Sequence, residues 1–484
     1  MGGIVRLAGL LLAGGIVVCS AAQAPGASYP VVHAQPLFAK PRPGETLRSW
    51  TPRLGTVRGG RAAFLIVVDV PDTTARPVLS SAGLRGAHGR LSVRVREVLP
   101  VTVPGASRSV PRSVQGDVPD VVAPPSTRGR RTSRRIYLVE AAVPRSAAAG
   151  DYAGNVLVRL GATVRRVAVT THVAGAVLPR LHALHTRFGV WRTNYDRFEH
   201  HTGAWHRVST LLRRERIGDG TVAGADDAVD VETDISGPAR VDPVVVARAA
   251  ARSARSILSR RPGAVPMLYV FDEPKPSENG RIRSLGAALR AHAPGVRQLV
   301  TSPPIPSLMS SVGVWAMHVG ALTPSTVAAV HRAGAEAWSY TSCCEDHGAP
   351  TLLIDDTAVR NAAVPVAAWL HGADGLLYWS VFAAQSAPYP TARTPAEVRT
   401  PALGDGQVIY PGSLFGRAAP LPSFRLELVR EALQITDEAQ LLVRRGDGAL
   451  ARSILSRLVG TGGSVSGDPR VWADAELRLA RALD

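Results

Sequence analysis

The pattern of apolar and polar residues changes near residue 179 and divides the chain into two parts. Between about residues 39 and 179, short apolar runs are separated by Pro and Gly, and in one run Leu91, Val93 and Val95 alternate with polar residues. An alternation of period two places the apolar groups on one face of a β-strand. We therefore predict a β-sandwich, with further strands at residues 62–70, 136–142, 156–160 and 164–173.

In the second part of the chain, strands alternate with helices. One helix is predicted over residues 243–260, where Val, Ala and Ile recur at helical spacing. Another begins with Thr323 as its N-cap and Pro324 at its first position, and it ends at Gly334. The strands between the helices are short, continuous apolar runs. These runs are residues 188–191, 267–271, 298–301, 312–317, 337–340 and 376–379.

Continuous apolar strands between helices are typical of a parallel sheet that is buried on both faces. The number of such units favours a closed (β/α)8 TIM-type barrel, and an open doubly wound sheet is the alternative. No glycine-rich phosphate loop follows any of these strands, which argues against nucleotide binding. The predicted chain is multidomain α/β + all-β: a β-sandwich at 41–179, a barrel at 180–443 and a C-terminal helical extension, packed on the barrel, at 444–484.

The N-terminal residues 1–24 have the pattern of an export signal. An apolar stretch at residues 7–18 is followed by a small-x-small cleavage signal that ends at Ala24, which leaves residues 25–40 as a linker. Cys19 offers lipidation as an alternative, but Val18 stands before it, where lipoprotein signals have a small residue. The apolar stretch is too short to cross a bilayer well. We expect a secreted or cell-envelope protein without an integral membrane span.

Charge and cysteine content exclude several kinds of partner. The formal net charge of +18 is carried almost wholly by arginine, and no helix-turn-helix or RNA-binding signature accompanies it, so we predict no nucleic-acid partner. After signal cleavage, the remaining cysteines are Cys343 and Cys344, as two packed thiols or as a vicinal disulfide. They are too few and too closely spaced for a zinc site. We expect no metal and no cofactor.

The adjacent carboxylates Asp272 and Glu273 are the candidate catalytic residues. They follow the predicted strand 267–271, and polar residues just past the carboxyl end of a barrel strand face the active-site mouth. Consecutive residues of a regular strand point in opposite directions, so both reach one cleft only if the strand ends or bulges there. Close carboxylates resist joint ionisation, so we expect one raised pKa and hence one acid and one base. The alternative is a helix cap or a salt bridge with Arg281 or Arg283.

Four aromatic residues near the ends of two later strands are candidate substrate-binding residues. Trp338, Tyr340, Tyr378 and Trp379 have rings that would stack on a pyranose, although barrel packing is the alternative for each of them. The loop after Tyr340 also carries acidic pairs. Glu345-Asp346 and Asp355-Asp356 would bind sugar hydroxyls or supply a separate nucleophile, with solvated loop charge as the alternative.

Five ordered motifs between about residues 181 and 442 resemble those of glycoside hydrolase family 123-like proteins, and the preceding sandwich is similar to the N-terminal domain of that family. The motifs are Tyr269-Val-Phe-Asp-Glu-Pro274, Ala337-Trp-Ser-Tyr-Thr-Ser-Cys-Cys344, His371-Gly-Ala-Asp-Gly-Leu-Leu-Tyr-Trp-Ser380, Gly404-Asp-Gly-Gln-Val-Ile-Tyr-Pro-Gly412 and Pro422-Ser-Phe-Arg-Leu-Glu427.

The resemblance implies a β-N-acetylgalactosaminidase-type enzyme that retains configuration and uses the 2-acetamido group of its substrate as the nucleophile. Asp272 would orient the acetamide, while Glu273 would protonate the leaving oxygen and then activate water. Trp338, Tyr340 and Trp379 would shape the sugar subsite. By the same resemblance, Arg425 and Glu427 would brace the barrel mouth.

The sequence also departs from the family pattern. Glu215 stands where a histidine is expected, and Ile435 stands where the family has an acid. We therefore expect an exported hydrolase of N-acetylhexosamine-containing glycans, with two alternatives. One is an enzyme that uses Asp355 or Glu345 as a covalent nucleophile. The other is a glycan-binding or cell-surface protein that has lost activity on the same fold.

Overall fold

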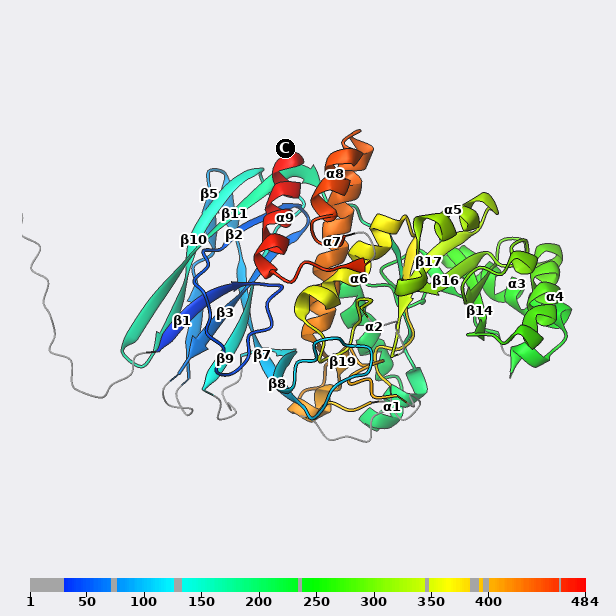
Figure 1. The fold of residues 1–484 in the computed structure, drawn as a ribbon, viewed down its shortest axis with the longest axis horizontal. Helices are drawn as coiled ribbons and strands as arrows, with labels where there is room; N and C mark the ends of the chain where they lie inside the picture. The colour runs from blue at the N-terminus through cyan, green and yellow to red at the C-terminus, as the bar shows by residue number, and fades with distance from the viewer. Residues whose placement is uncertain are drawn as a thin grey trace, which may run out of the picture.

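The computed structural model describes residues 30–70, 76–125, 133–233, 237–343, 348–383, 391–394, 400–460 and 463–484. A sandwich of two β-sheets lies beside a domain built on a parallel sheet, and helices α7 (Phe424–Arg444) and α9 (Pro469–Ala482) lie between them (Figure 1). The predicted signal sequence and Cys19 lie outside the described residues. Within the described ranges, no helix is both long enough and apolar enough to cross a membrane.

The predicted β-sandwich is present. One sheet has the strand order β1-β3-β9-β7-β8, and the other has the order β2-β11-β10-β5-β6 with β4 paired to β10. The strands are β1 (Val31–Pro36), β2 (Arg53–Arg58), β3 (Arg61–Asp69), β4 (Val78–Ser81), β5 (Leu84–Gly86), β6 (Gly89–Leu91), β7 (Val93–Val103), β8 (Gly116–Ala123), β9 (Arg134–Ala142), β10 (Gly150–Leu160) and β11 (Thr163–Val177). Buried residues such as Phe64, Ile66 and Val156 fill the space between the sheets.

The stretch predicted as a linker at residues 25–40 contains a strand instead. β1 pairs with β3 along its whole length, from Val31 opposite Asp69 to Pro36 opposite Phe64. Its apolar and polar residues do not alternate regularly, so no strand was predicted there. Pairing with a strong apolar strand decides its conformation.

The second domain contains a seven-stranded parallel sheet in the order β12-β18-β17-β16-β15-β14-β13. Its strands are β12 (His185–Phe188), β13 (Ala228–Asp230), β14 (Val265–Asp272), β15 (Arg297–Thr301), β16 (Val314–His318), β17 (Glu336–Thr341) and β18 (Gly375–Tyr378). An irregular segment, residues 217–220, joins its two edges. The Phe188 amide donates to the Gly218 carbonyl (2.9 Å), and the Asp230 amide donates to the Gly220 carbonyl (2.8 Å).

This arrangement is a barrel whose eightfold repeat is incomplete, so the (β/α)8 prediction is only partly met. Segment 217–220 takes the place of one strand, and no helix separates it from β13. Between β15 and β16 the chain forms only the short 3-10 helix η3 (Pro306–Leu308). The other helices around the sheet are α1 (Arg192–Glu199), α2 (Trp205–Arg214), α3 (Pro243–Arg260), α4 (Asn279–His292), α5 (Pro324–Arg332) and α6 (Ala358–His371).

The two predicted helices, one from its apolar spacing and one from its capping residues, are confirmed. The Asp242 carboxylate accepts hydrogen bonds from the amides of Val244 and Val245 at the start of α3, with Pro243 in the first turn. The Thr323 hydroxyl accepts from the Thr326 amide at the start of α5. These bonds satisfy amide groups that have no partner within the helix.

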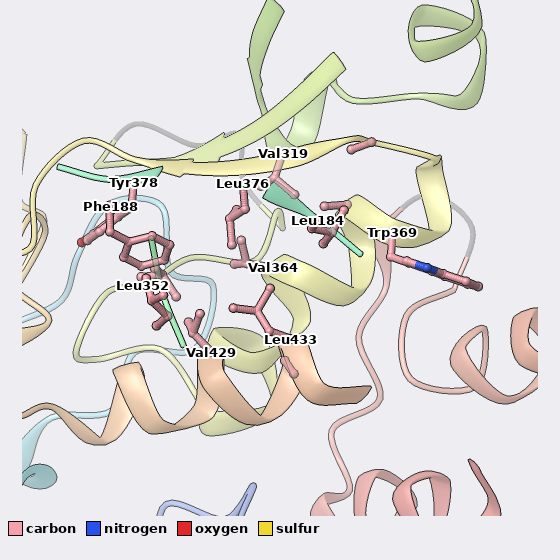
Figure 2. Packing of buried hydrophobic residues seen from close by; sticks show 14 of the residues in the cluster. Leu184, Phe188, Val319, Leu352, Val364, Trp369, Leu376, Tyr378, Val429 and Leu433 are labelled. Carbon is pink, nitrogen blue, oxygen red and sulfur yellow. The ribbon is translucent and has the colours of Figure 1, made fainter. Parts of the chain in front are cut away.

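The outer face of the barrel packs on α6 and α7. Figure 2 shows Leu376 of β18, Val364 of α6 and Val429 of α7 in one apolar layer, and Phe188 lies beside Tyr378 at its edge. The two rings are 5.6 Å apart between their centroids. Because α7 is covered on its other side by the sandwich and α9, this helix is buried over most of its length.

The C-terminal helix α9 packs mainly on β2 of the sandwich and also on α7, rather than on the barrel as predicted. In the close contact with β2, a Cβ at Gly55 would lie 2.5 Å from the Leu477 Cα. Glycine therefore allows the helix to approach the sheet. The extension fastens α7 to the sandwich.

Charged residues are buried where α7 meets the sandwich. Arg61 of β3 and Arg96 of β7 both bind Glu427 of α7 and Glu140 of β9, and Arg61 also binds Glu431 (Nε–Oε2 2.7 Å). Glu427 thus bridges the domains, and it is not at the barrel mouth as expected. Such buried pairs position the two bodies specifically rather than adding much net stability.

Arg425 fastens the same helix to another sandwich strand. Its guanidinium binds Asp120 of β8 (Nη2–Oδ2 3.0 Å), and both side chains are fully buried. It also donates to the carbonyls of Leu352, Gly404 and Gln407. Arg425 therefore holds a loop of the barrel domain against the sandwich, and like Glu427 it does not lie at the mouth itself.

Neutralising Glu476 of α9 should stabilise the protein at alkaline pH. Burial, together with Glu431 and Glu438, raises the pKa of Glu476 well above its usual value. The stability that this protonated carboxyl contributes is complete below the unfolded pKa and is lost as the pH rises through the folded pKa. We expect Glu476→Gln to raise Tm at pH 8, with a smaller gain at pH 5, measured by thermal unfolding.

Glu427→Gln is the matched control, because it neutralises a buried glutamate whose pKa is lowered instead of raised. Burial opposes ionisation of Glu427, but Arg96 and Arg61 lower its pKa far below the usual value. Its stabilising contribution is present above the unfolded pKa, so the substitution should cost about 3–5 kcal/mol at neutral pH. An unchanged or lower Tm of Glu476→Gln at pH 8 would contradict the assignment.

Candidate active site

An extra residue in β14 brings the two candidate carboxylates to the mouth of the barrel. Tyr269 pairs with Leu299 and Phe271 with Val300, so the register shifts by one residue between them. Asp272 consequently faces Thr301 on the inner side, whereas a regular strand would direct it outward. The next residue, Glu273, has a left-handed backbone with φ 44°.

Thr301 and Tyr269 hold Asp272 in place. The Thr301 hydroxyl donates to Asp272 Oδ1 (2.8 Å), and the Tyr269 hydroxyl donates to the same oxygen (2.6 Å). Thr301 Oγ1 also accepts a hydrogen bond from the Glu273 amide (2.7 Å). A single hydroxyl on the neighbouring strand thus fixes both residues of the pair. It also supports a left-handed conformation that costs a non-glycine residue about 1–3 kcal/mol.

Glu273 is held by Tyr340 and His318. The Tyr340 hydroxyl donates to Glu273 Oε1 (2.7 Å), and His318 Nε2 lies 2.6 Å from that hydroxyl and 3.5 Å from Oε1. His318 chiefly, together with Tyr340, lowers the pKa of Glu273 below its usual value, although partial burial acts in the opposite direction. The expected raised pKa is therefore not found for Glu273 in the unliganded protein.

A hollow of about 300 Å³ opens beside Asp272. This is at the lower end of the range of about 300–1,000 Å³ that is typical of small-molecule sites. Its lining includes Tyr269, Trp191, Trp379, Arg187, Arg192, Asp219, Asp230 and Glu232. A larger hollow of about 540 Å³ beside Lys40 contains neither candidate carboxylate. We place the candidate site by its chemistry rather than by its size.

Trp379 lines the hollow, whereas Tyr340 is buried and reaches the candidate pair through its hydroxyl bond to Glu273. Trp379 is half-buried beside Trp191, with 5.1 Å between the ring centroids, and its Nε1 donates to Asp405 Oδ1 (3.1 Å). A Cβ at Gly406 would lie 2.4 Å from the Trp379 ring, so glycine allows the indole to occupy this position. Burial raises the pKa of Asp405 to about 6.

Trp338 and Tyr378 have a different place. Trp338 is fully buried in the lower part of the barrel, where it stacks on His185 at the start of β12 and its indole donates to Glu336 Oε2 (2.9 Å). Tyr378 points to the outer face, packs on Phe188 and is fully buried. The structure brings neither ring into the hollow, because strand parity directs one inward below the mouth and the other outward.

Asp355 is unsuited to act as a separate nucleophile. Its carboxylate is fully buried and accepts hydrogen bonds from the Ser107 amide and from the hydroxyls of Ser107 and Ser113, which belong to the sandwich domain. Asp356 is likewise buried, where it binds Arg360. Glu345-Asp346 and Cys344 lie outside the described residues, and Cys343 is disulfide-bonded.

One group of metal-ligand side chains occurs among the described residues, at the opposite end of the barrel. Ligand atoms of His185, Asp226 and Asp227 lie within 4.8 Å of one another. Burial opposes the charge on His185, but its hydrogen bonds to Asp226 and Asp227 raise its pKa to about 10. In the unliganded protein these side chains form an ion-paired group, with His185 Nδ1 3.0 Å from Asp226 Oδ1 and 2.8 Å from Asp227 Oδ1.

Several residues of this site were missed in the sequence. Arg187, His318 and Asp230 each stand at the carboxyl end of a barrel strand, the position that drew attention to Asp272. The same rule applied to every strand would have found them. Asp219 gave no such signal, because its segment has no regular strand pattern.

Comparison with known proteins identifies the second domain. Residues 303–442 match the model of the glycoside hydrolase 123 catalytic domain. This part of the chain resembles the catalytic domain of glycoside hydrolase family 123. The matched residues include Tyr340 and Trp379 but begin after Asp272 and Glu273.

The chain shares its fold with a solved structure of that family. A family 123 glycoside hydrolase from Clostridium perfringens, studied for glycolipid glycan hydrolysis, is 12% identical and superposes with a TM-score of 0.71 over 94% of this chain and 98% of that chain. The CooA pilin subunit of enterotoxigenic Escherichia coli, 8% identical over 30% of this chain and 98% of its own, has a TM-score of 0.17, too low to support an argument. No curated protein matches the chain.

Removing the Thr301 hydroxyl should impair both carboxylates at once. Thr301→Val is nearly isosteric, but it leaves the Glu273 amide unpaired, and we expect a loss of about 1–3 kcal/mol in stability. Misplaced catalytic groups should lower kcat/KM up to ~100-fold. Thr301→Ser, which keeps the hydroxyl, should stay near the wild type. Equal effects of Val and Ser would contradict this role.

His318→Phe should shift the pH dependence of activity. Phenylalanine keeps a ring against Tyr340 but removes the group that contributes most to the lowered pKa of Glu273. With that pKa raised, the carboxyl stays protonated to higher pH, so the alkaline limb of kcat/KM should move upward. A pH profile on an aryl glycoside measures this limb. An unmoved or lowered limb would show that His318 does not control Glu273.

Proposed function

We propose that the protein is an exported glycoside hydrolase that removes a terminal β-linked N-acetylhexosamine, preferably N-acetylgalactosamine, from a glycan. The observation that carries this proposal is the pair Asp272 and Glu273 at one strand end, beside a hollow lined by Trp379. The similarity of residues 303–442 to the glycoside hydrolase 123 catalytic domain and the fold shared with an enzyme studied on glycolipid glycans support it. The signal-like N-terminus supports export.

The two carboxylates have different partners and so suit different tasks. Asp272 lines the hollow and stays fixed by two hydroxyl donors, which suits a group that accepts the N–H of the substrate acetamide. Glu273 has an exposed side chain that is held only by Tyr340 and His318, which suits a group that exchanges a proton with the leaving oxygen and then with water. Adjacent carboxylates on one strand end serve these tasks better than two acids on opposite sides of a glycosidic bond.

The proposed reaction has two steps. In the first, the acetamide oxygen of the substrate attacks the anomeric carbon, the glycosidic C–O bond breaks, and the leaving oxygen takes the proton of Glu273. Asp272 accepts a hydrogen bond from the acetamide nitrogen, which becomes positively charged as the oxazoline ring closes. In the second, Glu273 removes a proton from water, which attacks the anomeric carbon and reopens the ring with net retention.

Sugar binding must raise the pKa of Glu273 for the first step. The unliganded carboxyl has a lowered pKa, so it is ionised at neutral pH. A sugar that covers Glu273 excludes water from it, and desolvation favours the protonated form. A second hollow of about 380 Å³ shares Arg192, Asp230 and Glu232 with the first and offers room for the rest of the glycan.

Hydrolysis of aryl β-N-acetylgalactosaminide, β-N-acetylglucosaminide and β-galactoside by the wild type and two variants tests the proposal. We expect cleavage of the two acetamido sugars, and Asp272→Asn and Glu273→Gln should each lose about 10²–10⁴-fold in kcat/KM. Comparable cleavage of the plain galactoside would exclude participation of the acetamide. Sugar binding without hydrolysis of any substrate would favour an inactive glycan-binding protein.

A further inference from the structure

The Arg187 guanidinium is presented to the hollow with most of its donors unused. Arg187 is at the carboxyl end of the first barrel strand, lines the hollow, and its side chain is 12% exposed. Among the described residues, its one hydrogen bond runs from Nε to Asp230 Oδ1 (2.8 Å). Guanidinium carries further N–H donors on both Nη atoms, which can bind a ligand in the hollow.

The position of Arg187 is fixed from two sides. Asp230 binds Nε, and the guanidinium lies 5.1 Å from the centroid of the Tyr269 ring, whose hydroxyl donates to Asp272. Burial opposes the charge on Arg187, but Asp230 raises its pKa above the usual value. A fixed, charged, planar donor group next to Asp272 is suited to bind two neighbouring oxygens of a ligand.

The charges around the hollow indicate which ligand these donors bind. Arg187 pairs with Asp230, and Arg192 pairs with Glu232 (2.6 Å). These two pairs leave the carboxylates of Asp219 and Asp272 as excess negative charge among the lining residues. Asp219 is 5% exposed, and its Oδ2 has no hydrogen-bond partner in the described structure. An anionic ligand would be repelled here, whereas hydroxyl groups match both the donors and the unpaired acceptor.

We propose that Arg187 is the specificity-determining residue of the hollow, where it donates to ring hydroxyls of an uncharged terminal sugar, while the excess carboxylates exclude sulfated and acidic sugars. This inference rests on the proposed function, because it takes the hollow beside Asp272 as the site of the terminal sugar. It narrows the substrate class, because the terminal sugar must have free ring hydroxyls that Arg187 can bind and must carry no charge.

Direct binding tests the inference without any hydrolysis. The probes are N-acetylgalactosamine, its 3-deoxy and 4-deoxy derivatives and its 6-sulfate, titrated into the full-length mature protein by calorimetry. We expect the wild type to bind the parent sugar, to lose affinity for at least one deoxy derivative and to bind the 6-sulfate more weakly. A tighter 6-sulfate, or equal affinity for all three uncharged sugars, would overturn the proposal.

Arg187→Met removes the donors and keeps the apolar stem. We expect it to bind N-acetylgalactosamine ~10- to 100-fold more weakly, since a hydrogen bond to a charged group contributes about that much. The deoxy derivative that the wild type discriminates against should then bind no worse than the parent sugar. Arg165→Met, on the exposed surface of β11 in the sandwich, is the matched control for loss of one arginine and should match the wild type.

Arg187→Lys keeps a positive charge and keeps the test valid if the methionine variant does not fold. Lysine is a point donor without the planar fork, so it should restore part of the affinity but not the discrimination between deoxy sugars. Full discrimination by the lysine or methionine variant would overturn the role of Arg187.

The outcomes separate this inference from the proposed function. Sugar binding with the expected pattern but no cleavage of any aryl glycoside would leave the inference standing and defeat the proposed activity. If the wild type cleaves N-acetylgalactosaminides and the Arg187→Met variant discriminates between the deoxy sugars as well as the wild type does, the proposed activity stands and the inference is wrong. If N-acetylgalactosamine, N-acetylglucosamine and galactose all fail to bind the wild type, the hollow is no site for an uncharged sugar and the inference falls.

Discussion

The candidate site depends on one extra residue in β14. Without the register shift between Tyr269 and Phe271, Asp272 would point into the helical layer, and the hollow would lose the Asp272 carboxylate. The left-handed backbone of Glu273 then turns the next carboxylate toward Tyr340. Both irregularities cost free energy and are held by the Thr301 hydroxyl. Local strain here has a direct chemical result, since it holds two carboxylates at the end of one strand, Asp272 on the hollow and Glu273 on Tyr340.

The sandwich contributes to the site although none of its described residues lines the hollow. Asp120 binds Arg425, which donates to the carbonyls of Gly404 and Gln407 on either side of Asp405. Asp405 in turn accepts the hydrogen bond from Trp379 at the mouth. A chain of buried polar contacts therefore runs from a sandwich strand to an aromatic wall of the hollow. Because of this chain of contacts, the buried salt bridges between the two domains also hold the aromatic wall of the hollow in place.

The sequence was sufficient to predict most strands and the position of the carboxylate pair, because both leave local signals. The strands are apolar runs, and the pair consists of polar residues just past the end of one run. Prediction failed for Tyr378 because one sequence does not tell which side of the strand faces the inside of the barrel. It failed for Trp338, which points inward below the mouth, because the depth of a residue depends on how the strands are staggered. It also failed for Glu427, whose partners Arg61 and Arg96 are 366 and 331 residues away in sequence. Arg187 needed the closed barrel, because only closure brings β12 close to β14. The remaining residues of the site depend on contacts between segments that are far apart in the sequence, and such contacts leave no local signal.

The electrostatics of the mouth constrain how a proton donor can work there. His318 and Tyr340 stabilise ionised Glu273 in the open site, so the resting residue is a poor acid. This arrangement suits the second step of the proposed reaction, in which the carboxylate must remove a proton from water. The first step then requires the sugar itself to displace solvent and to change the balance toward the protonated form. A substrate that does not cover Glu273 would bind without being protonated, so proton transfer is coupled to full occupation of the mouth.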